Sequence, residues 1–115
     1  MVIQENRVRI LDFAHSRRER EILEFLYRHG ESHAREVQAS LDGSPAYSTV
    51  RAFLTVMVRK GVVRRRRKGV AYLYEPVVPL QVMRDLALRK LVHIYFGDSV
   101  RAIIDALQGL DRSNL

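Results

Sequence analysis

The sequence predicts a mainly helical protein with one small β-hairpin, and three observations lead to this fold class. Apolar residues recur at helical spacing in three consecutive segments between residues 16 and 60. From residue 62 to residue 75 the period changes to that of extended strands around a run of basic residues. Residues 80–109 are again helical in pattern and carry many apolar side chains.

Capping residues and apolar stripes define the first two helices. Ser16 and Glu19 have the spacing of a capping box, and Gly30 suits the end of the first helix. The buried stripe of this helix comprises Ile22, Leu23 and Leu26. A second helix fits Ser32–Leu41 with Ser32 as its N-cap, and turn-forming residues follow it.

The third helix is the most regular segment of the chain. We expect it to begin between residues 44 and 47 and to end at Lys60, because Gly61 follows. Its apolar residues, which share one face, are Val50, Phe53, Leu54 and Met57. The opposite face is polar and basic.

The hairpin follows the third helix directly. Val62, Val63 and the arginines after them form its first strand, and Val70–Glu75 forms its second. We expect Arg67-Lys68-Gly69 at the tip. Three helices followed by a basic hairpin are the plan of a winged helix-turn-helix domain.

In such a domain the recognition helix enters the major groove of DNA, and residues near its start reach base edges. The candidates on the third helix are Tyr47, Ser48, Thr49, Arg51 and Thr55. Arg51 can make the bidentate contact to guanine that carries much sequence discrimination. The polar side of an ordinary amphipathic helix would look the same, so these residues alone do not establish DNA binding.

The wing strengthens the DNA-binding interpretation, because five adjacent like charges repel one another unless an anion neutralises them. The wing residues expected on the DNA backbone or in the minor groove are Arg64, Arg65, Arg66, Arg67 and Lys68. A solvated charge run is the alternative. The position of the run directly after a candidate recognition helix favours DNA.

The C-terminal helices carry more apolar residues than a solvated tail needs. We predict that they form a dimer rather than extra core, because two recognition helices match a palindromic site. The candidates for dimerisation are Leu86, Leu91, Tyr95, Phe96, Val100, Ile103, Ile104 and Leu107. The predicted division is an extension of unassigned role at 1–14, a winged-helix domain at 15–77 and a helical dimerisation region at 78–115.

Length and composition limit the classes of protein that the chain can form. Its 115 residues suffice for one compact domain with a short appendage, and its net charge of +7 favours a polyanionic partner. The absence of cysteine excludes disulfides, thiolate zinc sites and a cysteine nucleophile. We expect a cytoplasmic protein without membrane insertion, because neither a signal peptide nor an apolar run of about 18 residues is present.

No residues form a recognisable catalytic or metal site in the sequence. His29 and His33 are four residues apart, but Gly30 breaks the helix between them. Gly-rich phosphate loops, paired carboxylates and Ser-His arrangements are not evident. We therefore expect neither enzyme activity nor a metal or other cofactor.

Five segments match one family in order and spacing: Glu19–Gly30, Ala46–Arg51, Arg59–Val63, Arg66–Pro76 and Phe96–Ser99. They resemble the first helix, the recognition helix and its exit, the wing and the C-terminal helix junction of the penicillinase-repressor (BlaI/MecI) family. The resemblance implies a homodimeric repressor bound to an inverted-repeat operator in double-stranded DNA. It also implies that Ser48, Thr49 and Arg51 face the bases while the basic wing residues hold the backbone.

Three departures limit what the resemblance implies. In the best-known members a membrane sensor protease detects β-lactam antibiotics, and the repressor is cleaved in its dimerisation region. The resemblance therefore implies a membrane sensor protease as a possible partner, but the Asn-Phe bond cut in those members has no counterpart in Leu91–Phe96, which puts this control in doubt. Val56 stands where the family often has a basic residue, so one phosphate contact is missing. The absence of cysteine excludes the copper-responsive branch.

Two other functions fit the same sequence. One is a winged-helix interaction module that binds protein or RNA through its basic wing, and a sequence preference for duplex DNA would separate it from a repressor. The other is a repressor of a different family that senses a small ligand in the dimer arm. Tyr95 and Phe96 could line such a pocket, although ordinary packing also explains them.

Overall fold

The computed structural model describes residues 16–113, so the predicted N-terminal extension at 1–14 lies outside the described residues. The described chain divides into two compact units, with the boundary between Leu80 and Gln81. The first unit contains three helices and a sheet, and the second contains the C-terminal helices.

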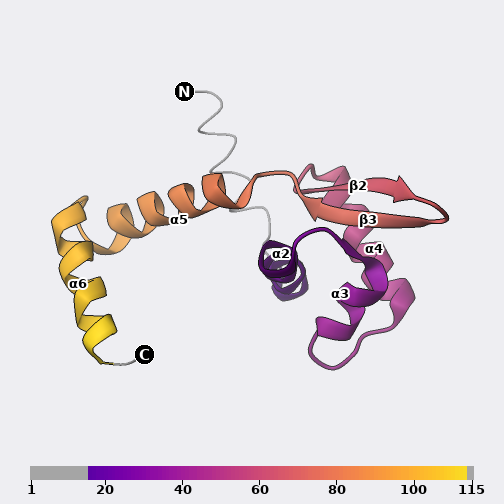
Figure 1. Ribbon diagram of the computed structural model, residues 1–115, viewed down its shortest axis with the longest axis horizontal. Coiled ribbons are helices and arrows are strands. Elements are labelled where there is room, and N and C mark those ends of the chain that lie inside the picture. The colour runs from indigo at the N-terminus through magenta and orange to yellow at the C-terminus, as the bar shows by residue number, and fades with distance from the viewer. Residues whose placement is uncertain (1–15, 114–115) are drawn as a thin grey trace. The chain divides into compact units, whose positions relative to one another are not determined.

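Three helices and a three-stranded antiparallel sheet form the first unit (Figure 1). The helices are α2 (Arg17–His29), α3 (Ala34–Ser40) and α4 (Tyr47–Arg59). The strands, in the sheet order β1-β3-β2, are β1 (Ser32–His33), β3 (Ala71–Pro76) and β2 (Val63–Lys68). The β2–β3 hairpin projects past the helices as a wing (Figure 1). The predicted fold class, mainly helical with a small hairpin in a winged helix-turn-helix, is confirmed.

One hydrophobic core joins the helices to the base of the hairpin. Ile22 of α2, Val37 of α3 and Val50 of α4 are each 0% exposed. Val63 of β2 and Tyr74 of β3 belong to the same buried cluster. Burying an apolar side chain of this size contributes about 1.5–3 kcal/mol, so the core determines which face of α4 remains outside.

The start of the second helix differs from the prediction. Ser32, expected as its N-cap, instead pairs with Tyr74 in the sheet, and its hydroxyl donates to the Gly30 carbonyl at 2.8 Å. His33 is the N-cap, and its backbone N–H donates to the Glu36 carboxylate at 2.9 Å. The helix begins later than expected because pairing with β3 keeps Ser32 extended.

The hairpin is also tighter than predicted. Arg67 and Lys68, expected at the tip, lie in β2, and Lys68 pairs with Ala71. Gly69 and Val70 form the turn, and Gly69 has a φ of +63°, a conformation that two-residue hairpin turns assign to glycine. The strand therefore continues through the whole basic run, and its side chains alternate between two faces.

The N-terminus of α2 forms one half of the predicted capping box. The Ser16 hydroxyl accepts a hydrogen bond from the Glu19 backbone N–H at 3.0 Å. The Glu19 carboxylate instead accepts from Lys60 Nζ, at 3.2 Å and 3.4 Å to its two oxygens. The Glu19 side chain is 8% exposed and that of Lys60 39%. A buried carboxylate at the start of α2 thus depends on a cation at the end of α4.

Replacing Lys60 with Met is expected to lower the free energy of unfolding by about 1–3 kcal/mol, because a buried carboxylate loses its charged partner. Methionine keeps most of the apolar stem of lysine. The change in the free energy of unfolding, measured by urea unfolding of Lys60→Met, therefore reports mainly the loss of the charge. Adding Glu19→Gln should restore part of the stability, since removing both charges costs less than leaving one unpaired. Unchanged stability in Lys60→Met would show that water already solvates Glu19.

The second unit consists of α5 (Leu80–Tyr95), which begins at the unit boundary, and α6 (Val100–Arg112). The predicted interruption at Gly97 is confirmed. Gly97 and Asp98 have φ values of +53° and +64°, left-handed conformations that end α5. The Ser99 side chain then caps the start of α6.

Candidate nucleic-acid interface

The residues predicted to read DNA lie at and beyond the start of α4. Those that are exposed are Ser48, Thr49, Arg51 and Thr55. They face outward because Val50 and Leu54 of the same helix are buried in the core. Thr55 Oγ1 donates to the Arg51 carbonyl at 2.8 Å, so its hydroxyl hydrogen is used within the helix. Thr55 is consequently a weaker candidate donor than the other three.

A groove of about 540 Å³ lies between the starts of α3 and α4 and the hairpin. Its lining includes Arg35 from α3, Tyr47 and Arg51 from α4, and Ala71 and Tyr72 from β3. The tertiary structure therefore brings the start of the predicted recognition helix and the wing to one surface.

The Tyr47 ring contacts two arginines at this groove. Tyr47 is half-buried against the core, unlike the exposed candidates after it. The Arg35 Cζ atom lies 4.2 Å from the ring centroid and the Arg51 Cζ atom 5.9 Å, both within the range of cation–π attraction. Sequence reasoning missed Arg35, because no local pattern separates it from other exposed basic residues.

Strand alternation divides the basic residues of the wing between two faces. On one face, Arg64 Nε donates to Glu75 at 2.9 Å, and Arg66 donates twice to Glu31, both at 2.7 Å. The hydrogen bond from Arg66 holds the pKa of the Glu31 carboxyl below its usual value, and Glu31 raises the pKa of Arg66. Both groups therefore remain charged at neutral pH. Arg64 and Arg66 already have carboxylate partners within the protein.

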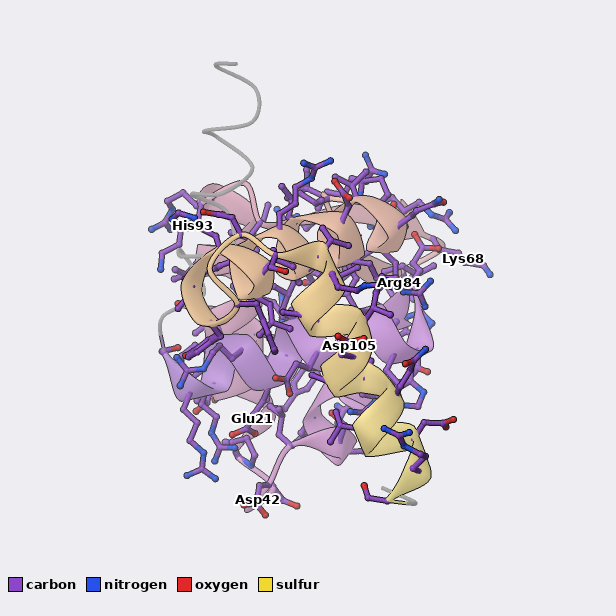
Figure 2. All side chains as sticks on the ribbon, turned by 90° about the vertical axis from the view of Figure 1, so that its left-hand side faces the viewer. Glu21, Asp42, Lys68, Arg84, His93 and Asp105 are labelled. Carbon is purple, nitrogen blue, oxygen red and sulfur yellow. The ribbon has the colours of Figure 1, made fainter. Side chains whose placement is uncertain are left out.

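Arg65 and Arg67 point to the opposite face, where Tyr72 is the cross-strand partner of Arg67. The Arg65 Cζ atom lies 4.5 Å from the centroid of the Tyr72 ring. Arg67 Nε donates to the Gly69 carbonyl at 3.2 Å. Lys68 falls by the same alternation on the face of Arg64 and Arg66, and it extends outward from the hairpin (Figure 2). Because Tyr72 lines the groove, Arg65 and Arg67 continue the cationic surface that begins at α4.

The neighbouring residues Arg65 and Arg66 are expected to respond differently to replacement. Arg65→Ala should weaken binding to any duplex by roughly tenfold and reduce the slope of log affinity against log salt by about 1, because one phosphate contact is lost. Arg66→Ala should change the affinity much less, since Glu31 already occupies its guanidinium. Fluorescence anisotropy at several salt concentrations measures both variants, which carry equal net charge. Equal losses would contradict the division of the wing into two faces.

The C-terminal unit exposes most of the residues predicted for dimerisation. The exposed ones are Leu91, Tyr95, Val100, Ile104 and Leu107. Phe96 is half-buried. Leu86 and Ile103 are only 6% and 5% exposed.

The described part of the chain shows neither a membrane-spanning helix nor a metal site. No helix within residues 16–113 is long and apolar enough to cross a membrane. Among the same residues, no three His, Cys, Asp or Glu side chains gather to hold a metal ion. The His33 ring lies against the Tyr72 carbonyl at 3.3 Å, and His29 stacks on Phe25 with ring centroids 4.5 Å apart.

Several solved structures share this fold. The homodimeric winged helix-turn-helix DNA-binding domain of Mb0332 from Mycobacterium bovis, a possible ArsR-family regulator, is 26% identical, with a TM-score of 0.55 and 80% of each chain covered. Rv0081 of M. tuberculosis is 26% identical, with a TM-score of 0.58 over 84% of this chain and 94% of that one. The regulator Tm0710 from Thermotoga maritima shows the same fold at 17% identity and a TM-score of 0.55, covering 99% of this chain and 90% of that one.

Sequence comparison identifies the family to which the chain belongs. No curated protein matches the chain significantly. The profile of the penicillinase repressor family matches residues 15–112, which include all of the described helices and strands. This match confirms the resemblance seen in the recognition helix, the wing and the C-terminal junction. The chain belongs to the penicillinase repressor family and is a DNA-binding transcription regulator with a winged-helix fold.

Proposed function

We propose that the protein represses transcription as a homodimer bound to an inverted-repeat operator. The observation that carries this proposal is the groove-side surface, where Arg51, Arg65 and Arg67 are exposed. None of the three forms an ion pair with a carboxylate of residues 16–113. Cations arranged in this way bind phosphates and release the counterions of DNA, which favours association.

The start of α4 supplies the proposed sequence readout at the same surface. Ser48 and Thr49 offer hydroxyls, and Arg51 offers a guanidinium that can bind guanine in the major groove. Arg65 and Arg67 then hold the backbone from the wing. Occupation of a promoter by this surface would block transcription.

The C-terminal unit supplies the proposed dimer contact. Val100, Ile104 and Leu107 recur on one face of α6 and are 62%, 41% and 49% exposed. Apolar side chains gathered on an exposed face mark an interaction surface. A second copy of the chain is the occupant that suits the function, because a twofold dimer matches the two halves of an inverted repeat. The similar Mb0332 domain is homodimeric.

Cleavage by a membrane sensor protease is not part of the proposal. Residues 91–96 lack the Asn-Phe bond that is cut in the best-known members of the family. We therefore expect release from DNA to proceed without cutting of this segment.

Selection of bound duplexes from a random DNA pool, repeated at low and moderate salt, tests the proposal. Enrichment of an inverted repeat at both salt concentrations would support a dimeric, sequence-specific regulator. Salt-sensitive binding with no enriched sequence would contradict it and favour a general electrostatic module for protein or RNA. Enrichment of a single half-site would contradict the dimer alone.

A further inference from the structure

We propose that Arg35 binds a phosphate of the DNA backbone and that Tyr47 is the residue that positions it. The inference rests on the proposed DNA-binding function and extends it in two ways. It adds one DNA contact from α3, which the sequence did not indicate. It also changes the role of Tyr47 from reading bases to holding a cation in place.

The position of Arg35 follows from the packing of α3 against α4. Val37, two residues later on α3, is 0% exposed in the core and anchors the helix. Arg35 itself is exposed, and its Cζ atom lies 4.2 Å from the centroid of the Tyr47 ring. A long side chain stacked on a fixed ring has lost much of its freedom before an anion arrives, so binding costs it less entropy.

Tyr47 is suited to this positioning role by its own surroundings. It is the first residue of α4, and its side chain packs against the buried core cluster. The Arg51 Cζ atom also lies within 5.9 Å of its ring centroid, so one ring gathers two guanidinium groups at the groove. The aromatic face attracts both cations through its quadrupole.

The two guanidinium groups have no internal counter-charge in the described chain. Neither Arg35 nor Arg51 forms an ion pair with a carboxylate of residues 16–113. Glu36, the acidic neighbour of Arg35, accepts from the His33 backbone N–H at 2.9 Å and caps the helix. Two like charges near one ring repel each other, and a bound anion would relieve this repulsion.

A backbone phosphate is the anion that fits the placement of Arg35. In a helix-turn-helix the second helix enters the major groove, while the first helix crosses the backbone. Arg35 lies on the first of these helices, α3, and Arg51 on the second, α4. A guanidinium binds a phosphate with two parallel hydrogen bonds, which makes arginine suited to this contact. The contact that positions Arg35 depends on the Tyr47 ring and not on the Tyr47 hydroxyl.

Arg35→Ala tests the phosphate contact on two duplexes, the one enriched by selection and a scrambled one of equal length. We expect roughly tenfold weaker binding to both, and a slope of log affinity against log salt that falls by about 1. Arg28→Ala, an exposed arginine of α2, removes the same charge away from the groove and should leave both quantities unchanged. A loss confined to the enriched duplex would overturn the inference, because it would show base readout.

Two replacements of Tyr47, measured on the scrambled duplex, test the positioning role. Tyr47→Phe keeps the ring and should bind like the wild type. Tyr47→Leu removes the quadrupole and should weaken binding as Arg35→Ala does, and the double variant should be no weaker than either single one. Additive losses in the double variant would overturn the coupling. Weaker binding by Tyr47→Phe would show that the hydroxyl contacts DNA, and would also overturn it.

Neutral methylphosphonate linkages, introduced one at a time into the enriched duplex, identify the phosphate itself. At one linkage the wild type should lose affinity while Arg35→Ala does not. Absence of any such linkage would overturn the assignment. A wild-type protein that binds no duplex would instead refute the proposed function as a whole. Wild-type binding with an unaffected Arg35→Ala would refute only this inference.

Discussion

Replacing both Ile104 and Leu107 with Asp is expected to leave the protein monomeric and to weaken binding to the inverted repeat by about 10²–10⁴-fold. Both side chains are part-exposed on one face of α6, so the new carboxylates would be buried at the proposed dimer contact. A dimer binds its second half-site at a high effective concentration, and a monomer loses this advantage while keeping every DNA contact. Light scattering should give the mass of one 13.4 kDa chain.

A duplex with a single half-site separates the loss of the dimer from a loss of folding. The variant should bind this duplex as a wild-type winged-helix unit does, because no residue of that unit has changed. Arg101→Ala with Arg112→Ala makes the same change in net charge, with both residues exposed on another face of α6. This control should remain dimeric. A double-Asp variant that stays dimeric would place the dimer contact elsewhere.

Arg51→Ala is expected to cost about 1–3 kcal/mol of binding free energy on the enriched duplex and little on a scrambled one. The reason is that a guanidinium bound to a guanine edge discriminates between sequences, whereas a contact to phosphate does not. Anisotropy titrations of the two duplexes measure the difference, and repeating the selection with the variant should show relaxed preference at one base pair of each half-site.

Arg59→Ala is the matched control for this prediction. Arg59 is exposed in the last turn of the same helix, so the variant has the same net charge but an intact start of α4. Its affinities for the two duplexes should stay in the wild-type ratio. If Arg51→Ala weakened binding to both duplexes equally, Arg51 would be a backbone contact and the readout would have to come from Ser48 and Thr49.

Much of the fold could be predicted because its signals are local. Ser16 caps α2, Gly61 follows the end of α4, and Gly97 interrupts the C-terminal helices, each within a few residues of the boundary that it marks. The apolar stripe of α4 also predicts its outward face, so the exposure of Arg51 follows from Val50 and Leu54 being buried. The errors lie where a distant segment intervenes. Pairing with β3 delays the second helix.

The sequence by itself therefore determined the order of the elements, the winged-helix plan and the outward face of α4, because periodicity and capping act over a few residues. Only the tertiary structure decided which cations are available to an anion. Arg66 is bound by Glu31, 35 residues away, whereas the adjacent Arg65 lies over Tyr72. Nothing in the sequence alone distinguishes these two arginines. Strand alternation and packing between distant segments separate them, and the same packing places Arg35 on the Tyr47 ring.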